Sequence, residues 1–298
     1  MKIIDTHHHL WDLETNRYPW LVEPIEHFTG DYSSICKTYL ISDLINEPSK
    51  HELVKSVHVQ AEFDHDDDPV KETAWLQSVS EGSDSKGLPN AIIGYADLAD
   101  PGVENVLERH SEYNNTRGVR HMLNFDEDPS LRFNQHGDLM SNQQWLSGYR
   151  LLAKYGLSFD LQVWPWQLAE SAKLAKSIPE VPIILDHTGM PLRQGINDFE
   201  NWRAGMRTLA QAPNVSVKIS GLVMVDQDWT VDSLRPFVLD TIEIFGPERC
   251  MFASNFPVDK QWTSYDSIWN TYDEITSEFS VNERERMFHN NAELFYRI

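Results

Sequence analysis

Short apolar runs recur along the chain, and segments with helical periodicity separate them. Eight of these runs are interpreted as buried strands, although the first is too short for periodicity to classify. They lie at residues 3–4, 56–62, 91–96, 118–123, 157–163, 181–187, 215–220 and 250–254. Between them, apolar positions at helical spacing predict helices over 141–156, 166–178, 199–212 and 233–246.

Strands that alternate with helices predict one (β/α)8 barrel domain over residues 1–298. Asp100-Pro101 predicts a helix N-cap followed by proline at the first helical position, and Ser280 with Glu283 predicts a capping box. The alternative is a doubly wound open sheet. It is disfavoured because no Gly-x-Gly-x-x-Gly follows the first strand and because polar residues stand at nearly every strand end.

Residues 12–55 depart from this regular alternation. They form an irregular, aromatic stretch that contains Tyr18, Trp20, Phe28, Tyr32 and Tyr39. Long loops in compact domains are often functional, so we expect a long aromatic loop after the first strand that covers or lines a cavity. The alternative is that its rings pack on the outside of the barrel.

Composition restricts the partners. With 46 acidic and 25 basic residues, the net charge of −21 argues against nucleic acid and anionic membrane surfaces. No run of 18 apolar residues occurs, and because Met1-Lys2 leads directly into the first predicted strand we expect no signal peptide. Cys36 and Cys250 lack metal-binding spacing and are expected to be reduced. We therefore expect a cytoplasmic protein acting on a small molecule; a homo-oligomer is compatible with the sequence.

The most distinctive chemistry lies in the segment from Asp5 to Asp12, which contains three consecutive histidines. On a strand, His7 and His9 face one way and His8 faces the other. Two imidazoles on one face can hold a divalent ion or a substrate oxyanion. A purification tag or a solvated turn is the alternative, but the histidines are embedded in structured-looking sequence.

Other polar side chains stand where the predicted strands end, which is where barrel enzymes place their active sites. In Asp186-His187 only one side chain should enter the barrel mouth, because adjacent strand residues face opposite ways. We expect that residue to be His187, oriented by Asp186, and the alternative is a packing histidine. Arg120 and Lys218 could hold a carboxylate or a carbonyl, or could instead form ion pairs.

Further strand-end residues are candidates for substrate binding. Asp160 and Gln162 share a face and could bind hydroxyl groups, or could form a polar layer inside the barrel. Trp164 could supply a stacking wall, although tryptophans also pack on helices. Glu62 is the remaining candidate for binding substrate or pairing with a cation.

Several motifs together resemble the amidohydrolase superfamily over essentially the whole chain. They are Asp5 to Asp12, Tyr18 to Leu21, Phe159 to Gln162, Leu185 to Pro191, Lys218 to Gly221 and Phe252 to Val258. More narrowly, they resemble its lactonase branch, which includes fuconolactonase, rhamnonolactonase, sulfomuconolactonase and pyrone-dicarboxylate lactonase. The resemblance implies a distorted (β/α)8 barrel that hydrolyses the ring ester of a sugar-acid or related lactone.

The resemblance also implies roles for individual residues. His7 and His9 match the His-x-His pair of the first strand, and His187 matches the histidine of the sixth strand. Asn255 stands where the superfamily's water-activating aspartate is found, and an amide cannot act as a general base. Arg120-His121 stands where the fourth strand would supply a bridging ligand.

Because Asn255 and Arg120-His121 depart from the family pattern, and Asp160 or Gln162 replaces the fifth-strand histidine, a binuclear metal site is disfavoured. We expect catalysis without a cofactor, or one weakly bound divalent metal, zinc before others, held by His7, His9 and His187.

The sequence hypothesis is lactone hydrolysis. Arg120 and Lys218 would hold the substrate, the three histidines would polarise the ester or move protons, and Asn255 would orient water. Two alternatives remain, namely a metal-dependent hydrolase or decarboxylase of the same superfamily, and a non-catalytic barrel that binds sugar acids. Ring size and stereochemistry would depend on the shape of the pocket.

Overall fold

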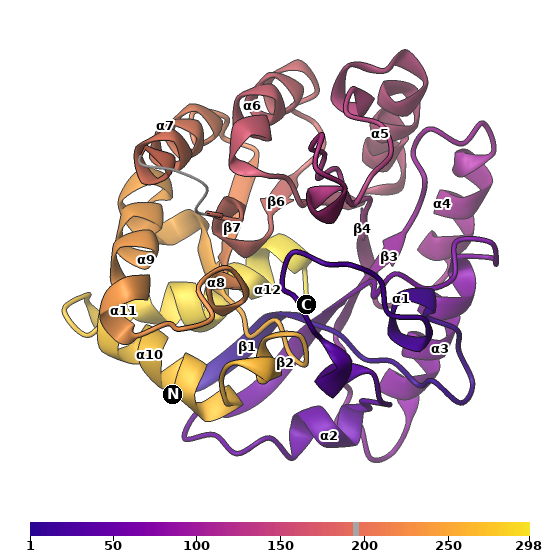
Figure 1. The fold of residues 1–298 in the computed structure, drawn as a ribbon. Coiled ribbons are helices and arrows are strands. Elements are labelled where there is room, and N and C mark those ends of the chain that lie inside the picture. Colours follow the sequence, from indigo (N-terminus) through magenta and orange to yellow (C-terminus); the bar gives the residue numbers. More distant parts are fainter. Residues whose placement is uncertain (193–196) are drawn as a thin grey trace.

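The eight predicted strands are present and pair in sequence order into one parallel sheet (Figure 1). Their bounds are β1 Lys2–His8, β2 Glu52–Val59, β3 Ala91–Tyr95, β4 Thr116–Arg120, β5 Ser158–Leu161, β6 Ile183–Leu185, β7 Val215–Ile219 and β8 Cys250–Phe252. The computed structural model describes residues 1–192 and 197–298. The predicted (β/α)8 barrel is confirmed, and it is nearly closed.

The barrel closes between the first and last strands through the residues that follow β8. His9 N donates to Phe256 O at 2.7 Å, and Asn255 N donates to His7 O at 2.8 Å. We call this junction between β1 and the residues after β8 the seam. Within it, the Asp5 carboxylate accepts hydrogen bonds from Ser254 N at 2.9 Å and from Ser254 Oγ at 2.6 Å. The seam therefore fixes the position of the histidine-bearing end of β1.

Helices surround the strands, as Figure 1 shows. The longer ones are α3 Val70–Glu81, α4 Val103–Ser111, α5 Gln143–Tyr155, α6 Leu168–Ser177, α7 Asp198–Leu209, α9 Val231–Phe245 and α10 Tyr265–Ile275. The shorter ones are α1 Pro19–Val22, α2 Ile41–Ile45, α8 Leu222–Val225, α11 Val281–Glu285 and α12 Asn291–Tyr296, with a π-helical turn η8 Arg286–Asn290 before α12. Single 3-10 turns are η1 Ser33–Ile35, η2 Pro129–Leu131, η3 Leu139–Ser141, η4 Pro165–Gln167, η5 His187–Gly189, η6 Pro247–Arg249 and η7 Asp259–Gln261.

The two predicted helix starts had different outcomes. The capping box is confirmed: Ser280 Oγ accepts from Glu283 N at 3.3 Å, and Glu283 Oε2 accepts from Ser280 N at 2.9 Å. The start at Asp100 is wrong, because α4 begins at Val103 with Gly102 at its N-cap. Asp100 Oδ1 instead accepts from Gly102 N at 2.6 Å, in the turn that precedes the helix.

The aromatic segment after β1 contains α1, η1 and α2 and lies over one end of the barrel. Trp11 and Tyr39 exchange backbone hydrogen bonds of 3.0 and 2.9 Å, which hold the two ends of the segment together. Trp20, Phe28 and Tyr32 line a cavity. The prediction that this segment lines a cavity is therefore confirmed.

The C-terminal helix α12 packs against the inner strand residues. Tyr296 is fully buried in a cluster with Ile4, Val57 and Ile184, and Figure 1 shows the C-terminus near the middle of the ring of helices. The Tyr296 hydroxyl donates to Asp160 Oδ2 at 3.2 Å. The last helix thereby supports the polar layer of the barrel interior. None of the described helices is both long and apolar enough to cross a membrane.

Candidate active site

The two histidines of β1 that were predicted to share a face do so. The ring centroids of His7 and His9 are 5.0 Å apart, and both side chains are buried. His8 faces the other side, where its Nε2 lies 2.9 Å from Ser56 Oγ. The alternation of a strand therefore persists to the end of β1 and brings His7 and His9 to one place.

His187 reaches the same place from the sixth strand. Its ring centroid lies 4.3 Å from that of His7. The ring also packs on Gly221, where an added Cβ would stand 2.7 Å from His187 Nδ1. Only glycine permits this approach, since the φ of Gly221 is also +63°.

Of Asp186-His187, His187 alone lines the cavity at the barrel mouth, as expected, but the two side chains do not face opposite ways. Asp186 Oδ1 lies 3.2 Å from His7 Nδ1, so Asp186 and His187 both contact His7. The physical reason is that β6 ends at Leu185, and His187 has a φ of +53° in a 3-10 turn. Strand alternation no longer applies there. Asp186 has the orienting position predicted for it.

Beneath the histidines lies a buried layer of charges. Lys218 Nζ is 2.5 Å from Asp160 Oδ2, 3.0 Å from Asp186 Oδ1 and 3.3 Å from His7 Nδ1. Lys218, Asp160 and Asp186 are all fully buried. Lys218 and Asp160 were predicted to bind substrate, but neither lines the cavity described below. The ion pair left open as the alternative is present, because β5 and β7 point both side chains to the barrel interior.

Arg120, at the end of β4, is the other buried cation. It donates to Gln162 Oε1 at 2.8 Å and to the carbonyl of Gln60 at 2.6 Å, and lies 3.7 Å from Asp186 Oδ2. Arg120 and Gln162 both line the cavity, as a substrate-binding role requires. The two buried cations Arg120 and Lys218 are balanced by the carboxylates of Asp160 and Asp186.

Asn255 follows β8 in a left-handed conformation with φ +56°, which asparagine tolerates better than most residues. Its Nδ2 donates to Asp259 Oδ1 at 2.7 Å. Because this bond uses the amide nitrogen, the amide oxygen is the group left to accept a hydrogen bond. Asn255 also lines the cavity.

Part of this group lines a cavity of about 310 Å³, whereas His7, Asp160, Asp186 and Lys218 lie behind its lining. His9, His187, Arg120, Gln162 and Asn255 contribute to its wall. The other lining residues are Trp20, Ile25, His27, Phe28, Tyr32, Ala61, Glu62, Met122, Arg132, Phe133, Gln135, Met190, Met224 and Val258. Glu62 is thus in the position predicted for it.

Trp164 was expected to form a stacking wall, and the structure corrects this. It is fully buried, its Nε1 donates to Leu131 O at 2.7 Å, and it packs edge-on against Phe28 at 5.3 Å. Phe28 and Phe133 therefore stand between Trp164 and the cavity. The sequence places Trp164 just after a strand and before a proline. That position does not indicate that its side chain points away from the barrel mouth.

The electrostatics of the site favour neutral histidines. Burial lowers the pKa of His7, His9 and His187 well below the usual 6.5, and the nearby cations Lys218 and Arg120 lower them further. A neutral imidazole has one nitrogen free to accept a proton or bind a metal. The site therefore presents bases rather than positive charges at neutral pH.

Backbone strain collects around the same cavity. Glu62, His187, Thr188, Met190 and Asn255 have φ between 47° and 57°. Non-glycine residues seldom adopt this region, and where they do they often mark functional sites. Four of the five also line the cavity, which ties the strain to the site.

The histidine cluster is suited to one divalent ion. Ligand atoms of His7, Asp186 and His187 lie within 4.8 Å of one another, and His7 Nε2 is buried without a hydrogen-bond partner among the described residues. The Nδ1 atoms of His9 and His187 are bonded to Val59 O at 2.8 Å and to Ser220 Oγ at 3.0 Å. Such bonds fix the ring orientation of metal-binding histidines.

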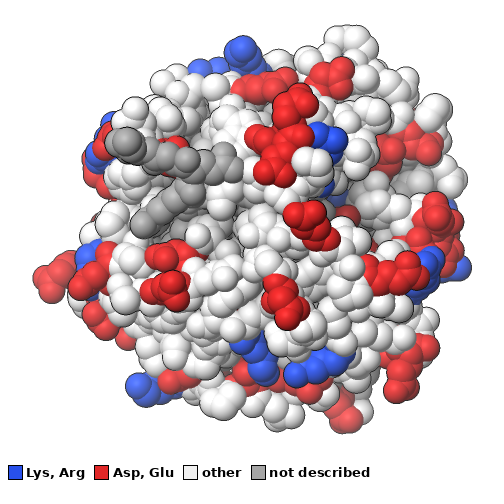
Figure 2. Space-filling view, in the orientation of Figure 1, with Lys and Arg blue, Asp and Glu red and all other residues white. Residues whose placement is uncertain are grey.

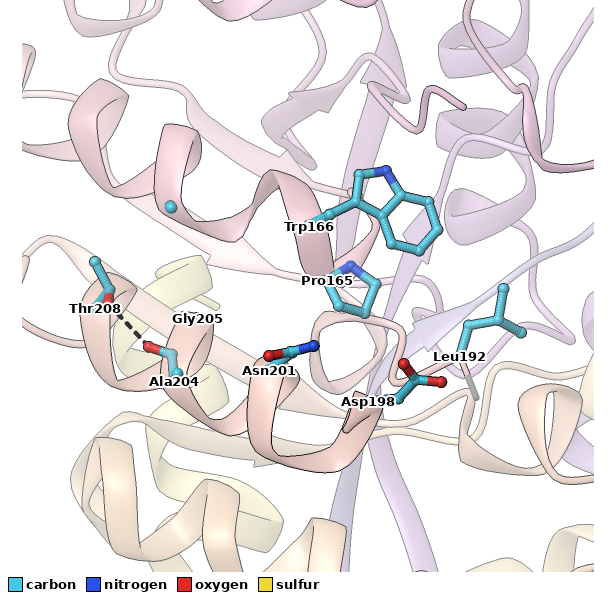
Figure 3. A pocket seen from close by; sticks show the side chains of 9 residues that line it. Pro165, Trp166, Leu192, Asp198, Asn201, Ala204, Gly205 and Thr208 are labelled. Carbon is cyan, nitrogen blue, oxygen red and sulfur yellow. Dashed lines mark hydrogen bonds between the residues drawn. The ribbon is translucent and has the colours of Figure 1, made fainter. Parts of the chain in front are cut away.

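A second cavity, of about 410 Å³, lies between η4 and α7 (Figure 3). Pro165, Trp166, Asn201 and Asp198 border it, and it shares no described lining residue with the first cavity. Its volume is larger, but His9, His187 and Arg120 line the other cavity, and His7, Asp186 and Lys218 are in contact with that group. We therefore assign the candidate active site to the cavity at the barrel mouth.

A (β/α)8 barrel that carries clustered histidines from β1 and β6 belongs to the class of amidohydrolase-type enzymes. The sequence model of the family Amidohydrolase matches residues 4–298, so the chain belongs to the amidohydrolase family. The resemblance predicted from the motifs is thereby confirmed, and the protein is a hydrolase.

Individual relatives resemble the chain over its whole length. An uncharacterized protein of Sinorhizobium fredii, y4mH, is 48% identical over 100% of this chain and 99% of its own. An L-fucono-1,5-lactonase of Burkholderia multivorans is 29% identical over 99% of this chain and 96% of its own. A crystal structure of an amidohydrolase from Burkholderia multivorans with bound zinc is 24% identical, covers 100% of both chains and has a TM-score of 0.78. This last likeness shows the fold.

Sequence reasoning missed several residues of the site. Met122, Met190 and Met224 line the cavity, and Asp259 holds the amide of Asn255. The methionines come from three different parts of the chain, and a methionine by itself does not indicate a site, although Met190 belongs to the motif from Leu185 to Pro191. Asp259 could have been suspected, because it follows Asn255 by four residues after a strand end.

Proposed function

We propose that the protein hydrolyses the ring ester of a lactone derived from a sugar acid or a related carboxylic acid. The observation that carries the proposal is the convergence of His7, His9 and His187 at the base of a cavity that Arg120 and Asn255 also reach. The match to an L-fucono-1,5-lactonase over nearly the whole chain supports an ester as the substrate.

In the reaction, a water oxygen bonds to the acyl carbon and the bond from that carbon to the ring oxygen breaks. His187 takes the proton of the water, because burial keeps its imidazole neutral. A proton is then returned to the ring oxygen, which leaves as the hydroxyl of a hydroxy acid. Arg120 faces the carbonyl oxygen and stabilises its developing negative charge.

Two further residues act by position. Asn255 accepts a hydrogen bond from the attacking water through its amide oxygen, since Asp259 holds its amide nitrogen. Lys218 does not line the cavity, and it stabilises the carboxylate of Asp186, which in turn orients His7. This assignment differs from the sequence hypothesis, in which Lys218 held the substrate.

A divalent ion, zinc before others, fits the same histidines. His7, Asp186 and His187 have ligand atoms close enough to hold it, and the ring of His9 lies beside that of His7 with the centroids 5.0 Å apart. When bound, such an ion polarises a carbonyl and lowers the pKa of bound water. A nitrogen of His187 that held the ion could not also take a proton, so the acid-base role given to His187 above belongs to the metal-free site.

The test compares lactone hydrolysis by wild-type protein and by a His187→Ala variant. A panel of lactones is used, and a pH indicator detects the acid that is released. We expect kcat/KM to fall by about 100- to 10,000-fold, the usual contribution of one acid-base group. His289→Ala is the matched control, since His289 lies on η8 and does not line the cavity. Unchanged turnover in a folded His187→Ala protein would remove His187 from the mechanism, and wild-type protein that hydrolyses no lactone would refute the function.

A further inference from the structure

We infer that the preferred substrate is a lactone whose ring carries an alkyl or aryl substituent, rather than a polyhydroxylated sugar lactone. This inference rests on the proposed lactonase function. It concerns the part of the cavity that lies away from the histidines, which would contact the body of the substrate rather than its ester.

Apolar side chains from four separate loops form this part of the cavity. Ile25 and Phe28 come from the segment after β1, and Phe133 comes from the loop after β4. Met190 follows β6, and Met224 lies on α8. Aromatic rings and thioethers offer dispersion contacts to carbon and adapt to its shape, but they accept hydrogen bonds only weakly.

The aromatic side chains of this wall pack on one another. The rings of Phe28 and Phe133 are 5.9 Å apart, and His27 contacts both at 4.6 and 5.3 Å. Trp164 supports them from behind at 5.3 and 5.9 Å. The apolar surface is therefore a supported wall rather than a set of isolated side chains.

Most polar side chains in the cavity already have partners within the protein. Arg132 donates to the carbonyls of Asp126 and Glu127 at 3.0 and 2.7 Å. His27 Nδ1 lies 2.6 Å from Thr29 Oγ1. These groups are held by their own loops and are not directed at a ligand.

Polar side chains of the cavity that lie nearer the strand ends also have partners within the protein. Glu62 accepts from Gln60 Nε2 at 2.5 Å and lies 3.3 Å from His65. Gln162 accepts from Arg120 and donates to Met122 Sδ at 3.2 Å. Gln135 also lines the cavity, and no described residue holds its side chain by a hydrogen bond. The other groups left to recognise a ligand are concentrated at the histidines, Arg120 and Asn255, where the ester binds.

This distribution disfavours a polyhydroxylated ring. Each hydroxyl buried against carbon or sulfur without a hydrogen bond costs about 1–3 kcal/mol. An alkyl or aryl substituent instead makes binding more favourable, by about 0.8 kcal/mol for each buried methylene. This corresponds to about a fourfold change in the binding constant. The cavity should therefore discriminate by apolar contact.

The experiment compares kcat/KM for δ-valerolactone, its 5-methyl, 5-propyl and 5-phenyl derivatives, D-glucono-1,5-lactone and L-fucono-1,5-lactone. We expect kcat/KM to rise by up to about fourfold for each added methylene. We also expect kcat/KM for the 5-propyl and 5-phenyl lactones to be at least about ten times that for the hydroxylated lactones. One buried hydroxyl without a hydrogen bond could produce this difference. Equal or faster hydrolysis of the hydroxylated lactones would overturn the inference and leave the lactonase function standing.

A pair of variants tests the wall itself. Ile25→Asn places an amide on the apolar wall, and Ile25 is 64% exposed, so the fold should tolerate the change. We expect the ratio of kcat/KM for the 5-propyl lactone to that for δ-valerolactone to fall by about threefold or more. Val22→Asn is the matched control, since Val22 is 54% exposed and does not line the cavity. An unchanged ratio in Ile25→Asn would contradict the inference.

The lactone panel gives one result if the proposed function is wrong and a different result if only the inference about the substituent is wrong. If wild-type protein hydrolyses no lactone in the panel, the proposed function fails and the inference fails with it. If lactones are hydrolysed without preference for the alkyl or aryl members, only the inference fails.

Discussion

The hydrogen bonds of single residues decide what the histidines can do. His9 Nδ1 lies 2.8 Å from the carbonyl oxygen of Val59, which can only accept, so Nδ1 carries the proton and Nε2 is free to accept one. His7 Nδ1 lies between the acceptor Asp186 Oδ1 at 3.2 Å and the donor Lys218 Nζ at 3.3 Å. His187 Nδ1 lies 3.0 Å from Ser220 Oγ, which can donate or accept. Among the three rings, His9 is therefore the one whose tautomer is fixed by its partner.

Asn255 offers a test at the residue scale. In a His187→Ala background, Asn255→Asp should restore kcat/KM by about tenfold or more, because the new carboxylate can act as the general base that an amide cannot. Burial raises the pKa of Asp259 well above its usual range, which favours the protonated form that can donate to the new carboxylate. The measurement is lactone hydrolysis at pH 7 by the single and double variants. A folded double variant no faster than His187→Ala would contradict the assigned position of the water.

Between elements, buried polar side chains connect helices to strand ends. Glu72 on α3 is 1% exposed, and its Oε1 accepts from Ala61 N at 3.0 Å, just beyond the end of β2. Asp5 makes the corresponding connection between β1 and α10, where it accepts from the Tyr265 hydroxyl at 3.1 Å. These carboxyls hold the rim of the barrel, and burial raises the pKa of both.

Glu72 gives a pH prediction at this scale. Burial raises its pKa from 4.5 to about 7, so the folded protein binds the proton more tightly than the unfolded chain. The contribution of Glu72 to the free energy of unfolding therefore decreases as pH rises from about 4.5 to 7, by about 3 kcal/mol in total. Glu72→Gln lacks this titration.

We expect Glu72→Gln to gain stability relative to wild type between pH 5 and pH 8, measured by urea unfolding at each pH. Glu108→Gln is the control, because Glu108 is exposed on α4. A stability difference between wild type and Glu72→Gln that does not change with pH would show that Glu72 is ionised in the folded protein throughout this range.

Across the whole molecule, charge is distributed unevenly. The net charge is −21, and acidic side chains are more widespread than basic ones on the face in Figure 2. Inside the barrel, by contrast, Arg120 and Lys218 balance Asp160 and Asp186. A divalent ion would add two positive charges to a neutral, buried cluster, which argues against a second ion.

We therefore expect at most one zinc ion per chain, and we expect chelation to remove it. The measurement is metal analysis of purified protein after incubation with zinc and dialysis, with and without a chelator. His187→Ala should lower the zinc content, because His187 belongs to the group of ligand atoms close enough to hold an ion, whereas His289→Ala should not, because His289 lies outside the cavity. Two retained ions per chain would contradict the assignment of Lys218 and Arg120 as the charge-balancing groups.

Local patterns in the sequence were sufficient for the barrel and for part of the site. Strand periodicity predicted the shared face of His7 and His9, and the strand-end positions pointed to His187, Arg120 and Asn255. These predictions succeed because strand alternation depends only on neighbouring residues, and because parallel strands in a barrel all end on one rim.

The tertiary structure alone decided which polar groups face the cavity and which are paired beneath it. Lys218 contacts Asp160, 58 positions away, and His7 contacts Asp186, 179 positions away. Strand alternation could not foresee the left-handed turn at His187 or the burial of Trp164 behind two phenylalanines. These features arise from contacts between distant segments, whose geometry is determined only when the barrel closes.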